Sequence, residues 1–425
     1  MIRKRKFSVF FACFCLAVSL ALDGCENFSS SSWEEPSLLP LSASFVLYAN
    51  DLARNDSAAA HLSTGVLMPV QPGASYALSF DADPSRKPPR LQIFRLVMRS
   101  DSLYIGSRIR DVKAIDSLGR WIYRFESRES EQTYWAPILV EGDSYYSGPV
   151  KNLFLDGVGN HSAHFSLNLV LVGSYGGTSD SVPLDSLSRL FLRRFREAFA
   201  AGGVSIDTLY LHRASERTDL STRYPDDIPW LAGKSSSDYF LSELGGWPNS
   251  PGEENVYHAL DLVLVHRIEM PGVLGYSVLF GGNLGAGLGS TVVVGTHYYV
   301  NAFTEHSQTA QEIVETAIHE TAHFFGLRHT TSTTSDLENS GDASNVEDGI
   351  PDTPYCGSVI RTKKLPRLFS VPLDAQSRQV LFKSAESRCP DANNPMFPTV
   401  NALEMEPFTE GQFTLLRKNL QLYPH

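Results

Sequence analysis

A short segment of this chain concentrates residue types that bind transition metals. Residues 319–330 read HETAHFFGLRHT and contain three of the chain's 12 histidines together with one glutamate. His319 and His323 are four residues apart, so a helix would place them one turn apart on the same face. Two imidazoles in that arrangement can chelate one zinc ion, with Glu320 beside them.

The flanking residues predict the helix and the turn that such a site needs. Between residues 309 and 325 the apolar residues recur at steps of three and four, which indicates an amphipathic helix. Gly326 permits the backbone turn that ends a helix, after which His329 can return as a third ligand. Three neutral ligands leave a zinc ion one open position for water, whose pKa falls from about 15.7 to about 7 at such sites. Glu320 is then the expected general base, without being a ligand.

The other histidines do not form such a pattern. His212, His266 and His297 fall in strand-like segments, and His258 and His306 lie near loops or helix starts. A lone histidine of this kind is more often a hydrogen-bonded structural or surface residue than a metal ligand, and we predict structural or surface roles for all five.

The zinc-binding segment resembles the long motif of the metzincin peptidases, H-E-x-x-H-x-x-G-x-x-H followed by a methionine turn. Downstream, DGIPDTPYC (348–356), CPDANNPMFP (389–398) and FTEGQ (408–412) resemble the pappalysin, or cytophagalysin, group within the metzincins. The resemblance implies zinc as cofactor, His319, His323 and His329 as ligands, Glu320 as base and Met396 as the methionine of the turn.

The resemblance carries one departure and two further implications. Pappalysins often have a tyrosine two residues after the methionine, whereas this chain has Pro398, and the MFP sequence is similar to matrixins. The resemblance also implies that the strand at 290–300 runs along the substrate cleft and pairs with an extended peptide. It suggests calcium as well, for which the acidic stretch from Asp336 to Asp352 supplies oxygen ligands, although a solvated acidic loop explains that stretch equally well.

The first residues have the pattern of an export signal. MIRKRK is followed by an apolar core of 16 residues, and LDGC at 22–25 resembles the lipobox of bacterial lipoproteins, in which the cysteine is lipidated. We therefore expect a signal peptide at 1–24, a lipid on Cys25 and a serine-rich tether at 25–42. The alternative is an ordinary cleaved signal. The predicted location is extracytoplasmic, either anchored to a bacterial membrane through this lipid alone or secreted.

The remainder predicts a multidomain protein. Between 43 and 178 the chain has short segments rich in β-branched and aromatic residues, separated by turn-forming residues, which indicates an all-β, sandwich-like domain. A glycine- and serine-rich linker follows, and residues 183–425 then form the predicted α/β (α+β) metzincin-like domain. In it we expect a helix at 184–201 that Gly202 and Gly203 end, with strands at 204–212, 260–269 and 290–300.

Cysteine arithmetic predicts one disulfide. Of five cysteines, Cys13 and Cys15 lie in the signal and Cys25 is the expected lipid site, which leaves Cys356 and Cys389. Two cysteines in an oxidising compartment have one intramolecular pairing, and the alternative is two buried free thiols.

These residues predict a zinc metalloendopeptidase with a protein or peptide substrate. A net charge of −11 argues against a nucleic-acid partner, which would need a basic surface. One alternative is a surface adhesin or binding lipoprotein with a vestigial zinc site, against which the intact Glu320 argues. Another is a zinc hydrolase that acts on non-peptide substrates.

Overall fold

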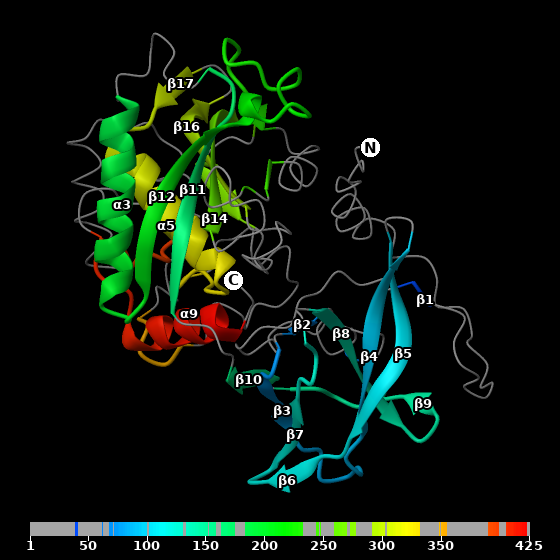
Figure 1. The fold of residues 1–425 in the computed structure, drawn as a ribbon. Coiled ribbons are helices and arrows are strands. Elements are labelled where there is room, and N and C mark those ends of the chain that lie inside the picture. Colours follow the sequence, from blue (N-terminus) through cyan, green and yellow to red (C-terminus); the bar gives the residue numbers. More distant parts are fainter. Residues whose placement is uncertain are drawn as a thin grey trace, which may run out of the picture. The chain divides into compact units, whose positions relative to one another are not determined.

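The computed structural model gives a mixed α/β protein that is mostly sheet (Figure 1). It describes residues 39–40, 62, 68–70, 72–99, 102–130, 133–151, 153–158, 163–174, 183–232, 244–245, 247, 259–269, 273–277, 291–301, 304–331, 348, 350–354, 390–398 and 405–422. The chain divides into two compact units, one built from 1–162 with 418–424 and the other from 163–417. None of the described helices is long and apolar enough to cross a membrane.

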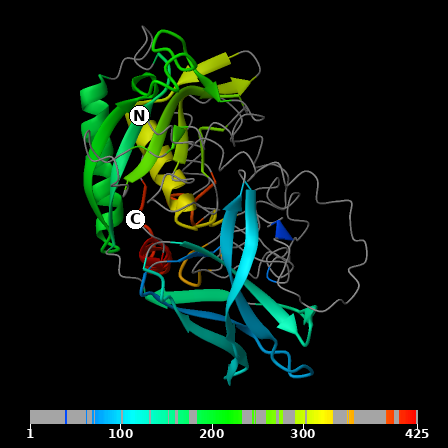
Figure 2. The same cartoon turned by 45° about the vertical axis from the view of Figure 1, so that its right-hand side comes forward.

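The first unit contains two antiparallel sheets. One has the strand order β1-β5-β4-β8-β2 with β9 beside β8, and the other has the order β10-β3-β7-β6. The strands are β1 (Leu39–Pro40), β2 (Met68–Val70), β3 (Ser75–Asp81), β4 (Arg90–Arg99), β5 (Ser102–Val112), β6 (Ile115–Ser117), β7 (Arg120–Glu126), β8 (Thr133–Glu141), β9 (Ser144–Tyr145) and β10 (Phe154–Val158). Figure 2 shows the long hairpin that β4 and β5 form in the first sheet.

Aromatic side chains form the core of the first unit. In β3 the buried residues alternate with partly exposed ones, as expected of a strand with one face in a core. The ring centroids of Phe125 in β7 and Trp135 in β8 are 6.3 Å apart, which brings the two sheets into contact. The hydroxyl of Tyr123 in β7 donates to the carbonyl of Pro89, 2.9 Å away, just before β4. Of these strands, β3, β4, β5, β7 and β8 coincide with segments that the sequence predicted from their β-branched and aromatic residues.

The second unit is built on one mixed sheet with the order β12-β11-β14-β16-β15, with β13 beside β14 and β17 beside β16. Its strands are β11 (His164–Leu171), β12 (Ser205–Arg213), β13 (Leu231–Ala232), β14 (Ala259–Ile268), β15 (Gly275–Ser277), β16 (Thr291–Asn301) and β17 (Thr304–Ser307). The pairs among β11, β12, β13, β14 and β16 are parallel, whereas β15 and β17 run antiparallel to β16.

The placement of β11 corrects the predicted domain boundary. The sequence assigned residues up to 178 to the first domain, but β11 lies between β12 and β14 in the second sheet. Every residue of β11 after His164 is buried, which is typical of a parallel strand covered on both faces and not of a sandwich strand with one exposed face. The nearly continuous apolar run FSLNLVLV carried this signal in the sequence.

Two helices cover one face of this sheet, and both agree with the prediction. Helix α3 (Leu184–Ala200) buries a row of four side chains, Leu187, Phe191, Phe195 and Phe199. Helix α5 (Ala310–Phe324) begins with a capping box between Thr309 and Glu312. Helix α3 contacts β12 and α5, and α5 contacts β16 and β15, so the two helices lie on the same face (Figure 1). A third helix, α9 (Glu410–Leu422), follows near the C-terminus.

Candidate metal centre

Helix α5 and the turn after it bring the three predicted histidines together. His319 and His323 lie on the buried side of α5. The helix ends at Phe324, and Gly326 in the following turn has a φ of 91°, a conformation that favours glycine. The N–H of Gly326 donates to the carbonyl of His323 at 2.9 Å. The chain then returns His329 to the helix, so that the possible ligand atoms of the three histidines all lie within 4.8 Å of one another. The spacing-based prediction of this cluster is confirmed.

One distance within the cluster is compatible with a shared metal ion. The Nε2 atoms of His319 and His329 are 3.3 Å apart. Tetrahedral zinc, with metal–nitrogen bonds of about 2.0–2.1 Å, would separate two ligand nitrogens by about 3.3–3.4 Å. The three side chains therefore can hold a metal ion. Within the part of the chain that the structure describes, no other group of three or more His, Cys, Asp or Glu residues is arranged in this way.

Backbone carbonyls fix the orientation of two of the rings. The Nδ1 atom of His319 lies 2.6 Å from the carbonyl oxygen of Pro395, and Nδ1 of His323 lies 2.8 Å from that of Leu327. A carbonyl can only accept, so each ring must carry its proton on Nδ1 and direct the lone pair of Nε2 into the cluster. Metal-binding histidines commonly have such a partner on the other ring nitrogen.

Burial keeps these rings neutral in the metal-free protein. It lowers the pKa of His319 to about 3, with the nearby His329 adding to the effect. Burial also places the pKa of His323 well below its usual value, and the charges of His329 and His319 contribute. Neutral imidazole is the form that binds a metal, so both side chains are in the ligand state at neutral pH.

Glu320 follows His319 on α5, and its side chain lies against strand β15. The side chain is buried, and this desolvation raises the pKa of Glu320 to about 8, although the hydroxyl and backbone of Ser277 offset the effect in part. Gly275 leaves the space that Glu320 occupies, because a Cβ atom at residue 275 would stand 2.8 Å from Cγ of Glu320. Gly275 and Ser277 could not be identified from the sequence, since β15 has only three residues and no periodic pattern.

The structure corrects the strand expected along the cleft. The segment 290–300 forms β16, but β16 lies between β14 and β15, so both of its edges are paired. Among the described residues β15 pairs only with β16 and is therefore the edge strand beside Glu320. The expectation failed because the sequence did not predict β15. Residues 275–277 form this strand and pair antiparallel with β16, so that they cover the edge of β16 that would otherwise face a peptide.

The predicted methionine turn lies against the histidine cluster. Met396 is fully buried, and its carbonyl oxygen accepts a hydrogen bond of 3.0 Å from the backbone N–H of Thr330. The neighbouring Pro395 supplies the carbonyl that orients His319. Asp391, which the sequence analysis did not single out, accepts hydrogen bonds from the hydroxyls of Thr330 and Thr331. No local pattern in the sequence connects Asp391 with these threonines, which lie about 60 residues earlier.

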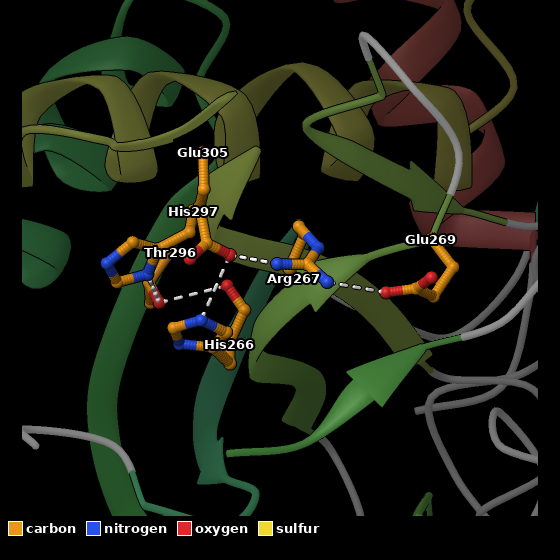
Figure 3. Close-up of polar contacts among 6 residues, drawn as sticks. All are labelled: His266, Arg267, Glu269, Thr296, His297 and Glu305. Atoms are coloured by element: carbon orange, nitrogen blue, oxygen red, sulfur yellow. Dashed lines mark hydrogen bonds and ion pairs between the residues drawn. The ribbon is translucent and has the colours of Figure 1, made fainter. Parts of the chain in front are cut away.

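A second group of polar side chains joins β14, β16 and β17 (Figure 3). The rings of His266 and His297 stack with centroids 4.2 Å apart, and Nε2 of His266 lies 3.1 Å from Oε1 of Glu305. Arg267 pairs with Glu305 and with Glu269. Although burial alone would raise it, the pKa of Glu305 is lowered, chiefly by the hydrogen bond from Arg267. His266 and His297 thus have the hydrogen-bonded structural role that the sequence predicted.

His212 is also a hydrogen-bonded core residue. Its Nε2 lies 3.0 Å from Oδ1 of Asn168, and burial lowers its pKa. His306 lies on β17 and is exposed.

Several predicted residues lie outside the described part of the chain. These are Cys25, Cys356, Cys389, His258 and the acidic residues 336–347. Of the proposed calcium ligands, Asp348 and Asp352 are described. Oδ1 of Asp348 accepts a hydrogen bond of 2.9 Å from the backbone N–H of Ile350. The carboxylate of Asp352 accepts hydrogen bonds from the backbone N–H of Gly411 and the hydroxyl of Thr409 at the start of α9. Asp352 therefore has a capping role there.

Comparisons with known proteins add little to this site. No protein-family model matches the sequence, and no curated protein matches it significantly. Among solved structures, the M60 catalytic domain of Clostridium perfringens ZmpC in complex with the sialyl T antigen is 10% identical, covering 71% of this chain and 55% of that one, with a TM-score of 0.11. A family two carbohydrate esterase from Cellvibrio japonicus is 12% identical over 48% of this chain and 57% of that one, with a TM-score of 0.09. Each match spans less than two thirds of the neighbour's own chain. Similarity this weak does not support a shared fold or a shared activity.

Proposed function

We propose that this chain is a zinc-dependent endopeptidase of the metzincin type, most similar to the pappalysins. The observation that carries the proposal is the convergence of three histidines on one point, with a buried glutamate beside them on the same helix. The succession of α3, β12, β14, β16 and α5 along the chain also agrees with the order that the resemblance implies.

Each residue has a specific part in the proposed reaction. His319, His323 and His329 would hold the zinc ion, which supplies Lewis acidity toward a carbonyl group and a water molecule when bound. Glu320 would accept the proton of the attacking water and later donate it to the leaving amine. Burial raises the pKa of Glu320 to about 8 in the metal-free protein. A zinc ion held by the neighbouring histidines would favour the carboxylate, which is the form that accepts a proton.

Strand β15 supports a peptide as the substrate. It is an edge strand within the described sheet, and its residue Gly275 lies directly beside Glu320. An extended peptide that adds to a sheet edge is held through its backbone, whatever its side chains. Pairing along β15 would therefore bring a peptide bond next to Glu320, which favours a peptidase over a hydrolase of non-peptide substrates.

We also propose that the enzyme acts outside the cytoplasm, anchored by a lipid on Cys25. The apolar segment and the LDGC sequence support this proposal. A tethered peptidase would meet its protein substrates at a membrane surface.

The test uses the mature chain from Cys25 onward, with Cys25→Ser to avoid lipidation. It is incubated with a peptide library, with and without a zinc chelator, and bound zinc is measured in parallel. We expect chelator-sensitive cleavage and one zinc per chain. The Glu320→Gln variant should keep its zinc while hydrolysis falls by about 10²–10⁴. Bound zinc without cleavage of any peptide would favour a binding lipoprotein, and a wild-type protein that retains no zinc would refute the metal centre.

A further inference from the structure

Asp391 is a buried carboxylate that the proposed reaction does not use. Only 1% of the residue is exposed, and Oδ2 accepts hydrogen bonds from the hydroxyls of Thr330 and Thr331 at 2.7 and 2.5 Å. A buried carboxylate without such donors would be strongly unfavourable, so the two hydroxyls and Asp391 depend on one another. These threonines are the two residues directly after His329.

The same two-residue segment is held through its backbone. The N–H of Thr330 donates to the carbonyl of Met396, and within the turn the N–H of Asn394 donates to the carbonyl of Asp391 at 2.9 Å. The chain after His329 therefore contacts the methionine turn at two points, one through the backbone and one through Asp391. Two contacts on consecutive residues fix both the position and the direction of the chain that leaves the third histidine.

The turn that carries Asp391 is itself fixed to another element. The side-chain amides of Asn394 and Gln412 exchange two hydrogen bonds, both 3.0 Å long, and Gln412 is fully buried at the start of α9. Pro395, in the same turn, orients His319. One turn thus contacts the helix that carries two of the ligands and the segment that carries the third.

We propose that Asp391 is a positioning residue for the third ligand, because it fixes Thr330 and Thr331 and so holds His329 at its distance from His319. This inference rests on the proposed zinc centre. A zinc site needs its three ligand nitrogens in a fixed geometry before the ion binds, and outer-shell partners of metal ligands typically contribute about 10- to 100-fold to metal affinity. Asp391 contacts the threonines after His329 and not His329 itself. We therefore expect its contribution to metal affinity to fall at the lower end of that range.

The experiment compares three variants of the full mature chain. Asp391→Ala removes the acceptor of both threonine hydroxyls. Asp391→Asn retains one oxygen that can accept from both. Val263→Ala is the control, because it removes buried methyl groups from β14 and leaves the methionine turn unchanged. Zinc affinity is measured by competition with a chromophoric chelator, and the coordination geometry by the visible absorption of the cobalt-substituted protein. Thermal unfolding of the metal-free proteins gives the stability of each variant.

We expect Asp391→Ala to weaken zinc binding about tenfold and to change the cobalt spectrum, whereas Asp391→Asn stays within about threefold of wild type. Val263→Ala should lower the unfolding temperature but leave zinc affinity and the spectrum unchanged. If Asp391→Ala does not fold, Thr330→Val carries the test, because it removes one hydroxyl donor and should weaken zinc binding several-fold.

Unchanged zinc affinity and spectrum in Asp391→Ala, or in Thr330→Val where it replaces that variant, would overturn the inference and leave the metal centre intact. Equal losses in Asp391→Ala and Val263→Ala would also overturn it, because the effect would then follow stability alone. A wild-type chain without zinc would overturn the metal centre and this inference together.

Discussion

Gly275 and Glu320 are in direct apposition: the backbone of β15 at Gly275 lies so close to α5 that a Cβ atom there would approach Cγ of Glu320 to 2.8 Å. The same added atom would be 2.8 Å from Cγ2 of Thr316, one turn earlier on the helix. The position of the proposed base therefore depends on a residue with no side chain, in a strand that the sequence did not predict.

Replacing this glycine should displace the base without removing the metal. In Gly275→Ala the new methyl group must push Glu320 or β15 aside, and small misplacements of catalytic groups lower rates by about 10²-fold. We expect hydrolysis to fall by at least about tenfold with bound zinc unchanged. Adding Thr316→Ser removes one of the two close contacts and should restore part of the activity. Full activity in Gly275→Ala alone would contradict the apposition.

The metal-free protein should lose stability on acidification because of its buried ligand histidines. Unfolded histidine titrates near pH 6.5, whereas burial holds the pKa of His319 at about 3 in the folded state. The unfolded chain therefore binds more protons below about pH 6.5, and stability falls as the pH decreases from there toward 3, by up to about 1.4 kcal/mol per pH unit for each such group.

Glu320 opposes this trend and must be removed to measure it. Its folded pKa of about 8 lies above the unfolded value, so its contribution to stability is present at low pH and is lost as the pH rises through 8. We would compare Glu320→Gln with Glu320→Gln/His319→Gln by denaturant unfolding of chelator-treated protein between pH 7.5 and 5. The second variant should show the shallower pH dependence. Parallel curves would rule out a neutral, buried His319.

The ion pair between Arg194 and Glu315 should be essential to the packing of α3 on α5. Oε1 of Glu315 accepts from Nε of Arg194 at 3.0 Å, and the side chain of Glu315 is only 1% exposed. Removing one partner of a buried pair leaves an uncompensated charge, so Arg194→Ala should destabilise the protein by roughly 3–5 kcal/mol. The neighbouring Arg193 forms an exposed pair with Glu197, and Arg193→Ala should have little effect.

Thermal unfolding of the two arginine variants measures the difference. Similar unfolding temperatures would mean that Glu315 is neutral when folded, which is the direction in which burial shifts its pKa. The double variant Arg194→Met/Glu315→Leu should recover much of the loss, because it removes both charges and retains apolar volume.

The remaining cysteines should be linked in the mature protein. A Cys356–Cys389 bond would close a loop of about 34 residues, which the chain-entropy model values at somewhere around 3–4 kcal/mol. We expect a non-reduced digest of protein matured in its own compartment to contain a linked peptide pair with both residues. Two separately alkylated peptides would exclude the bond, and Cys356→Ser/Cys389→Ser gives the loss of stability on removing it.

The candidate site was largely predictable because its residues lie close together in the sequence. Helix periodicity, the capping pair Thr309 and Glu312, and Gly326 all act within a few turns of His319. Gly275 and Asp391 were not predictable in the same way. Their roles arise from contacts with residues 45 and 61 positions away, and neither β15 nor the methionine turn has a local pattern that points to its partner.

The strands show the same limit. Short segments rich in β-branched and aromatic residues predicted several strands of the first unit, among them β3 and β7. The composition of a segment does not identify the sheet to which its strand belongs, as β11 illustrates. Which strands pair depends on packing against residues distant in the sequence and not on the strand's own residues.

The position of β11 between β12 and β14 also decides how the protein can be divided. The glycine- and serine-rich stretch from 173 to 181 looks like a convenient place to start a fragment, yet a fragment that begins there lacks the strand that joins the two sides of the sheet. Cleavage of the backbone in that stretch would have a different result. The strand β11 would no longer be covalently joined to the chain that follows, but it could stay hydrogen-bonded to β12 and β14. A short piece that carries β11 and the chain from 183 onward should therefore form a split, complementing pair, whose reassembly would report the folding of the sheet.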